Sequence, residues 1–255
     1  MQNDPVFRKS SRCLLSLLLG LLMAAFSVFG SDLAHQEKGV QKPEPWPNGV
    51  IPYDISKLNA AQQALVLRAM QRWMDTGANI HFVQRSNQVE YVNFTGKLDA
   101  GNNTSHVGFQ KGERTDINIT AFWWQQAEWM PAHELGHALG FFHEQQRWDR
   151  DQFITVHYEN IKPGRALDYD WIAKTNWLVS TLPYDYASIM HYRVCWAGAC
   201  EDECKDGDGS SPCAVLSPKD RKYDRVIGQW DENRISPLDT ERARLAYGKA
   251  PWPPR

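Results

Sequence analysis

The stretch HELGHALGFFHEQQRWDRD, residues 133–151, places three histidines and a glutamate at fixed spacings in an otherwise small and apolar segment. On an α-helix, His133 and His137 lie one turn apart on the same face, and imidazole nitrogens at this separation can bind one Zn²⁺. Glu134 lies one position further round the helix, where it can reach a water molecule on the metal and act as a general base. The spacing therefore predicts a hydrolytic zinc site.

Gly140 predicts where this helix ends. A residue without a Cβ adopts a left-handed conformation easily, so the chain can turn here and bring His143 back as a third ligand. Three protein ligands leave one position for water, which is typical of catalytic rather than structural zinc sites. The short HExxH pattern alone arises fairly often by chance, whereas the full HExxHxxGxxH pattern is far rarer.

The composition is that of an ordinary folded domain. The chain has 255 residues, of which 42% are hydrophobic and 23% charged, with a formal net charge of −2. This length suits one sizeable domain or two small lobes with a cleft between them. There is no basic excess, so we expect no nucleic-acid partner, and we expect a monomer.

The N-terminal segment has the layout of a secretory signal peptide. Basic residues at positions 8, 9 and 12 precede the apolar run CLLSLLLGLLMAAFSVFG, which ends in small residues. We expect residues 1–31 to be this signal, residues 32–44 to be a short linker or remnant pro-segment, and the mature protein to be secreted without membrane contact. The alternative is an uncleaved anchor, because about 18 apolar residues can just span a bilayer.

Four cysteines lie close together in the second half of the chain. Cys13 falls within the predicted signal, and the other four are Cys195, Cys200, Cys204 and Cys213. An even number in a polar loop of an exported protein predicts two local disulfides, with three pairings open. A structural zinc knot is the alternative, but the spacings include no CxxC pair.

The remaining patterns predict a small sheet and three helices. Short apolar or alternating segments at 46–55, 80–85, 89–96, 105–110 and 115–120 favour strands. Helical spacing favours helices at 60–77, from about 129–131 through the zinc motif, and at 236–248, the last capped by Ser236. The segment between the zinc motif and the last helix is less regular.

At these residues the chain resembles the astacin family of metzincin endopeptidases. The 133–151 stretch is similar to the family signature HExxHxxGFxHExxRxDRD, and WPNGVIPY (46–53), SHVGFQKG (105–112), PYDYASIMHY (183–192) and ISPLDTERARLAYG (235–248) resemble other family segments. The resemblance implies an α/β (α+β) metzincin fold for a catalytic domain at 45–251. Its N-terminal subdomain (45–143) would hold a twisted, mostly parallel sheet with helices. Its irregular C-terminal subdomain (144–251) would end in a helix, with the active-site cleft between the two.

The resemblance also implies a role for each matching residue. One zinc ion per chain would bind His133, His137 and His143, with Glu134 as catalytic base. Tyr192 would ligate the resting zinc and then swing away to stabilise the oxyanion. Two further residues would be structural: Met190 would pack beneath the zinc site, and Glu144 matches the glutamate that contacts the mature N-terminus. The charged residues at 147–151 would form a salt-bridged framework that supports the ligand-bearing turn.

The substrates implied are proteins or peptides. SHVGFQ would be the strand that a peptide joins by antiparallel β-addition, with Ser105 and Val107 as substrate contacts, unless it is a plain core strand. Arg193 could favour acidic side chains just beyond the scissile bond, although an ordinary surface arginine is the alternative. The cysteine loop would border the same side of the cleft.

The sequence departs from the family pattern in three respects. Family cysteines are missing near Asn103 and at Gly248, and the latency motif FxGD is not evident before WPNG. We therefore predict a secreted zinc endopeptidase and leave its activation route open. Two alternatives are a catalytically silent zinc-binding adhesion or toxin-like module, and a zinc hydrolase of non-peptide substrates.

Overall fold

The structure is a computed structural model that describes residues 39–97, 105–126, 129–199, 204, 209–228 and 235–250. The predicted signal peptide, most of the predicted linker, Asn103 and Cys200 lie outside the described residues. Within the described part, no helix is both long enough and apolar enough to cross a membrane.

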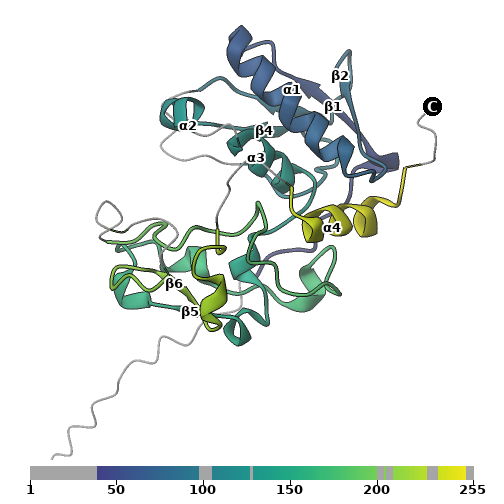
Figure 1. Ribbon diagram of the computed structural model, residues 1–255. Helices are drawn as coiled ribbons and strands as arrows, with labels where there is room; N and C mark the ends of the chain where they lie inside the picture. Colours follow the sequence, from purple (N-terminus) through teal and green to yellow (C-terminus); the bar gives the residue numbers. More distant parts are fainter. Residues whose placement is uncertain are drawn as a thin grey trace, which may run out of the picture. The chain divides into compact units, whose positions relative to one another are not determined.

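A parallel sheet forms the centre of the first half (Figure 1). Its order is β2-β1-β3-β4, with β1 at Val50–Asp54, β2 at His81–Gln84, β3 at Val92–Phe94 and β4 at Thr115–Ile117. Every described strand pair in this sheet is parallel. The predicted α/β fold with a mostly parallel sheet is therefore confirmed.

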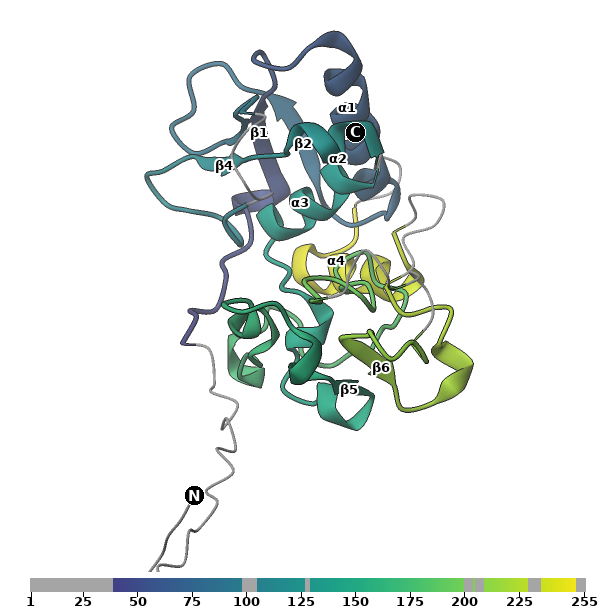
Figure 2. The same ribbon diagram turned by 90° about the vertical axis from the view of Figure 1, so that its left-hand side faces the viewer.

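Two helices pack with this sheet in one hydrophobic core (Figures 1 and 2). Helix α1 (Ala60–Asp75) begins at a capping box in which Asn59 and Gln62 exchange side-chain and backbone hydrogen bonds. Helix α3 (Met130–Ala138) carries the first part of the zinc motif. The Trp73 indole of α1 donates to the carbonyl of Ala132 in α3 at 2.9 Å, which fixes the two helices side by side. A short helix that the sequence did not predict, α2 (Ala121–Gln126), precedes α3.

The second half is built mainly from turns, as predicted. It contains a two-stranded antiparallel sheet, β5 (Ile154–Val156) and β6 (Leu216–Pro218), and then α4 (Pro237–Tyr247). Short 3₁₀ helices supply most of the other regular structure: Pro47–Gly49 in the first half, and Glu144–Gln146, Arg150–Gln152, Tyr158–Asn160, Ala166–Tyr169, Lys174–Asn176 and Arg221–Tyr223 in the second.

Helix α4 returns to the first half of the chain. Arg244 Nε donates to the carbonyl of Thr76 at 2.7 Å, and the Tyr247 hydroxyl donates to the carbonyl of Leu139 at 2.8 Å. These bonds attach α4 to the ends of α1 and α3. A helix far along the chain is thereby brought next to the zinc motif (Figure 2).

The predicted strand at 105–110 is wrong, because these residues form no strand. Gly108 has a φ of +82°, which interrupts an extended conformation. Its N–H donates to the carbonyl of His137 at 2.9 Å, and the N–H of Phe109 donates to the carbonyl of Glu44 at 2.8 Å. The segment is therefore tied to α3 and to the chain before β1, and β4 forms the edge of the sheet instead.

The end of the predicted linker makes specific contacts. Val40 packs against a cluster formed by Phe142, Ile172 and Trp177, and its carbonyl accepts a hydrogen bond from Asn176 Nδ2 at 2.8 Å. Packed structure therefore begins a few residues before position 45.

Candidate metal centre

Helix α3 carries two buried histidines whose orientation is fixed by backbone carbonyls. His133 Nδ1 donates to the carbonyl of Ile189 at 2.7 Å, and His137 Nδ1 donates to the carbonyl of Phe141 at 2.8 Å. Because a carbonyl only accepts, each ring carries its proton on Nδ1 and presents a lone pair on Nε2. This arrangement of a ligand held by a second hydrogen bond is typical of metal-binding histidines.

The turn at Gly140 brings the third histidine to the first two. Gly140 has a φ of +98°, as the sequence predicted, and the chain reverses so that Phe141 N donates to the carbonyl of Gly136 at 3.0 Å. His143 Nε2 then lies 3.2 Å from His133 Nε2 and 3.1 Å from His137 Nε2. In a tetrahedral site with zinc–nitrogen bonds of about 2.0–2.1 Å, ligand nitrogens are about 3.3 Å apart.

The donor set fits a zinc ion. Burial lowers the pKa of His133 to about 4 and that of His137 to about 3, so both rings are neutral at pH 7. Neutral imidazole is the form that binds metals. Lone pairs this close repel one another unless a cation lies between them. The three histidines can therefore hold one zinc ion.

Glu134 is a buried carboxylate, and one of its oxygens has no hydrogen-bond partner in the described part of the chain. Its side chain is 3% exposed, and Oε2 accepts no hydrogen bond from any described residue. Burial raises the pKa of Glu134 to about 8 in the metal-free protein. An unpaired carboxylate in this position is costly unless a nearby cation or water stabilises it. A metal ion and a water molecule bound next to Glu134 would supply the missing partners.

Met190 packs directly against the zinc helix. It is fully buried, and a Cβ added to Gly136 would lie 2.5 Å from its sulfur. The carbonyl of Met190 also accepts a hydrogen bond from Glu144 N at 2.9 Å, next to His143. The structure therefore places the predicted methionine between the zinc helix and the ligand-bearing turn.

Tyr192 lies beside the third histidine. Its ring centroid is 4.3 Å from that of His143 and 5.6 Å from that of Trp196. Burial, reinforced by the nearby Asp168, raises the pKa of the Tyr192 phenol well above its ordinary value. The phenol therefore keeps its proton at neutral pH in the metal-free protein and can act as a hydrogen-bond donor.

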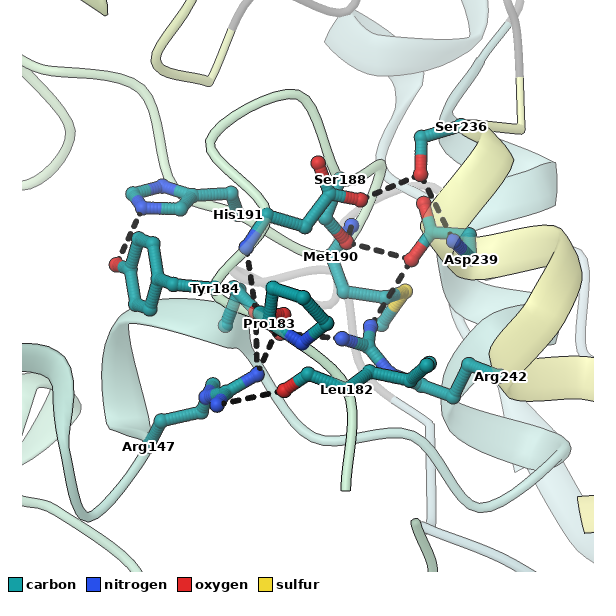
Figure 3. A network of polar contacts seen from close by, with 12 residues as sticks. Arg147, Leu182, Pro183, Tyr184, Ser188, Met190, His191, Ser236, Asp239 and Arg242 are labelled. Carbon is teal, nitrogen blue, oxygen red and sulfur yellow. Dashed lines mark hydrogen bonds and ion pairs between the residues drawn. The ribbon is translucent and has the colours of Figure 1, made fainter. Parts of the chain in front are cut away.

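The charged tail of the motif forms ion pairs, as predicted: Arg147 with Glu144 and Asp149, and Arg150 with the exposed Asp151. Glu144 is completely buried; Arg147 Nη1 donates to its Oε1 at 3.1 Å, and the backbone N–H of Asp185 donates to the same oxygen at 2.9 Å. No sequence pattern indicated the other partner, Arg242 of α4, whose Nη2 donates to Glu144 Oε2 at 2.8 Å. Figure 3 shows Arg147 and Arg242 converging on this region from opposite sides.

Replacing Asp185 with asparagine is expected to change how the free energy of unfolding depends on pH. Burial and repulsion from Asp239 raise the pKa of Asp185 from 3.8 to about 7. Between these values the folded protein holds a proton that the unfolded chain releases, so stability falls as pH rises through this window. The wild type should therefore lose up to about 1.4 kcal/mol per pH unit more than the variant. Urea unfolding at pH 4.5, 5.5, 6.5 and 8 measures the difference. If the free energies of unfolding of the wild type and the variant change with pH in parallel, Asp185 does not have the raised pKa.

The cysteine loop contains disulfides and not a zinc knot. Cys195 is bonded to Cys204, and Cys213 is also disulfide-bonded. Tyr169 donates its hydroxyl to the carbonyl of Trp196 at 2.5 Å, so the start of the loop is anchored beside Tyr192.

The three residues predicted to contact the substrate differ in what their side chains touch. Ser105 donates its hydroxyl to the carbonyl of His106 at 2.9 Å, whereas the Val107 side chain packs into the cluster around Phe142. The Arg193 guanidinium lies 6.0 Å from the ring of Trp129, at the start of the zinc helix.

The sequence matches a peptidase family and several of its relatives. The family model for the astacin peptidases matches residues 38–248. Tolloid-like protein 2 from Homo sapiens is 36% identical over 206 residues, which are 80% of this chain and 18% of that protein. The zinc metalloproteinase nas-12 from Caenorhabditis elegans is 37% identical over 147 residues, which are 58% of this chain and 36% of that protein. The chain thus spans only a minor part of these relatives.

A solved structure shares the fold over most of its length. High choriolytic enzyme 1, a hatching enzyme zinc-protease from Oryzias latipes, matches with a TM-score of 0.65 and 28% sequence identity. The match covers 82% of this chain and 94% of the enzyme.

Proposed function

The chain belongs to the astacin family of peptidases, and we propose that it is a zinc-dependent endopeptidase with Glu134 as general base. The observation that carries this proposal is the convergence of three histidine nitrogens beside Glu134, a buried carboxylate on the helix of His133 and His137 whose Oε2 has no hydrogen-bond partner among the described residues. A structural zinc site does not require such a carboxylate, whereas hydrolysis by an activated water does.

The zinc ligands, Glu134 and Tyr192 would have separate roles in hydrolysis. Zinc held by the three histidines would lower the pKa of a coordinated water towards neutrality and polarise the scissile carbonyl. Glu134 would accept the proton of the attacking water and pass it to the departing amine nitrogen. Tyr192, which we propose as a zinc ligand in the resting enzyme, would then donate its phenol proton in a hydrogen bond to the developing oxyanion. The reaction would proceed without a covalent intermediate between substrate and protein.

Removing the Tyr192 hydroxyl is expected to lower kcat about 100-fold, the usual cost of losing one oxyanion donor. Tyr192→Phe keeps the ring that packs on His143, so KM and the zinc content should change little. Steady-state kinetics with a fluorogenic peptide, together with zinc analysis, measure both effects. Tyr169→Phe is the control, because that hydroxyl bonds the Trp196 carbonyl instead. An unchanged kcat in Tyr192→Phe would remove Tyr192 from the mechanism.

We propose protein or peptide substrates and an exported location. The substrate would contact Ser105 and Val107 on the segment bonded to His137, and Arg193 beside Trp129. The disulfide-bonded loop that starts beside Tyr192 would border the same region. Disulfide-bonded cysteines and an apolar leader suit an oxidising, extracytoplasmic environment.

The decisive experiment is cleavage of a randomised peptide library by the zinc-loaded protein purified without residues 1–31. We expect internal peptide bonds to be cut, cleavage to stop with 1,10-phenanthroline, and cleavage to return when zinc is added. Zinc binding without cleavage of any peptide would favour the silent binding module. Hydrolysis of esters or other acyl compounds alone would favour the non-peptide hydrolase.

A further inference from the structure

We propose that Asp239 of α4 is a positioning residue for the zinc ligand His133, acting through Ser188 and the peptide unit between Ile189 and Met190. The inference rests on zinc binding by the three histidines and does not require peptide cleavage. Asp239 lies 106 positions after His133, and nothing in the sequence links the two.

A continuous chain of hydrogen bonds joins the two residues. His133 Nδ1 donates to the carbonyl of Ile189 at 2.7 Å. That carbonyl belongs to the peptide unit whose N–H is that of Met190, and Met190 N donates to Ser188 Oγ at 3.0 Å. The Ser188 hydroxyl donates in turn to Asp239 Oδ1 at 2.7 Å. Figure 3 shows Ser188, Met190 and Asp239 in this arrangement.

Every donor in this chain points towards the carboxylate. Hydrogen bonds arranged in one direction polarise one another, so the negative charge on Asp239 strengthens the Ile189 carbonyl as an acceptor. A stronger acceptor on Nδ1 increases the basicity of Nε2, the atom that faces the metal site, and holds the ring in place. Through this series of hydrogen bonds, the negative charge of Asp239 therefore increases the affinity of His133 for zinc.

Burial protects this connection from competition with water. Ser188 and Met190 are fully buried, and Ile189 and Asp239 are each 1% exposed. The second carboxylate oxygen, Asp239 Oδ2, accepts the N–H of Ile189 at 2.8 Å. Asp239 thus fixes the backbone on both sides of Ile189, and the carbonyl that meets His133 cannot rotate away.

Arg242 links the same carboxylate to a second metal ligand. Its Nη1 donates to Asp239 Oδ1 at 3.0 Å, and its Nη2 donates to Glu144 Oε2 at 2.8 Å. Glu144 directly follows His143 in the sequence, and its backbone N–H donates to the carbonyl of Met190 at 2.9 Å. The guanidinium therefore compensates the charge of Asp239 and ties the His143 turn to the same three-residue segment, 188–190.

Two buried serines beside Asp239 allow a matched test. Ser188→Ala removes the hydroxyl through which the hydrogen bonds from Asp239 reach His133. Ser236→Ala removes a hydroxyl of similar burial that accepts the backbone N–H of Asp239 at 2.8 Å, caps α4 and donates to Asp185 Oδ2. This hydroxyl makes no hydrogen bond to segment 188–190. Zinc affinity is measured by competition with a chromophoric chelator, at a temperature where circular dichroism shows each metal-free variant to be folded.

We expect Ser188→Ala to bind zinc about 10-fold more weakly than the wild type, at the lower end of the effect of losing an outer hydrogen-bond partner. Asp239→Asn should bind it more weakly still. Ser236→Ala should lower the melting temperature but keep zinc affinity within about twofold, because it removes a helix cap and a donor to Asp185 but no hydrogen bond on the path to His133. In the cobalt-substituted proteins, the visible absorption bands should shift for Ser188→Ala and not for Ser236→Ala.

Two results would overturn the proposal. One is wild-type zinc affinity in Ser188→Ala. The other is an equal loss of affinity in both serine variants, which would show a general loosening of the buried network. If Asp239→Asn fails to fold, the two serine variants still decide. Because these measurements record metal binding, a failed peptide-cleavage experiment leaves them valid.

Discussion

Replacing Glu134 with glutamine is expected to lower kcat/KM for peptide cleavage about a thousandfold, within the range that a general base contributes, while one zinc ion still binds. Glutamine keeps the shape of the side chain, so the three Nε2 atoms should stay in place. It cannot accept a proton from the attacking water, so the loss should appear in kcat and hardly in KM. Fluorogenic peptide kinetics and metal analysis of the same preparation test both statements.

The stability of the same variant controls for misfolding. Burial raises the pKa of Glu134 from 4.5 to about 8, so in the metal-free wild type stability is lost as pH rises through this window. Glutamine does not ionise, and the metal-free variant should therefore be at least as stable as the wild type at pH 8. A stable variant that binds zinc and still cleaves peptides at the wild-type rate would eliminate Glu134 as the base.

The zinc helix could be predicted from the sequence because its constraints are local. Helical periodicity places His133, Glu134 and His137, and a glycine with positive φ accounts for the return of His143. The same local logic predicted α1 and α4, and the structure shows their caps at Asn59 and Ser236. The failure at 105–110 has a tertiary cause, since the hydrogen bonds of that segment go to the carbonyls of His137 and Glu44 and not to a neighbouring strand.

The network beneath the site could not be predicted, because it joins residues from distant segments. In the sequence, Ser236 and Asp239 have the spacing of a helix cap, and the structure does show that cap, with Asp239 N donating to Ser236 Oγ. The further role of the Asp239 side chain appears only when α4 lies against residues 188–190. Arg242 likewise occupies an ordinary helix position until its pairing with Glu144, 98 positions earlier, is known. The turns between Arg150 and Tyr223 offer no periodicity from which such pairings follow.

Replacing Arg242 with methionine is expected to destabilise the folded protein by about 3–5 kcal/mol, the usual cost of removing one partner of a buried ion pair. The guanidinium is 3% exposed and bonds the carboxylates of both Glu144 and Asp239, so its loss leaves two buried negative charges undercompensated. Arg244→Met is the matched control on the same helix. Arg244 is partly buried and donates to a backbone carbonyl, so its loss should cost much less. Urea unfolding of the metal-free proteins at pH 8 gives both values.

The pH dependence and a double variant identify the cause of this loss. Burial already raises the pKa of Glu144, and without Arg242 it should rise further. The folded variant can then take up a proton that the unfolded chain releases, so the penalty should shrink as pH falls from 8 towards 5. Glu144→Gln combined with Arg242→Met should be more stable than Arg242→Met alone, because a buried pair replaced by neutral groups leaves no uncompensated charge. If the penalty is independent of pH and the double variant is the less stable of the two, Arg242 acts through packing of its side chain and not through its charge.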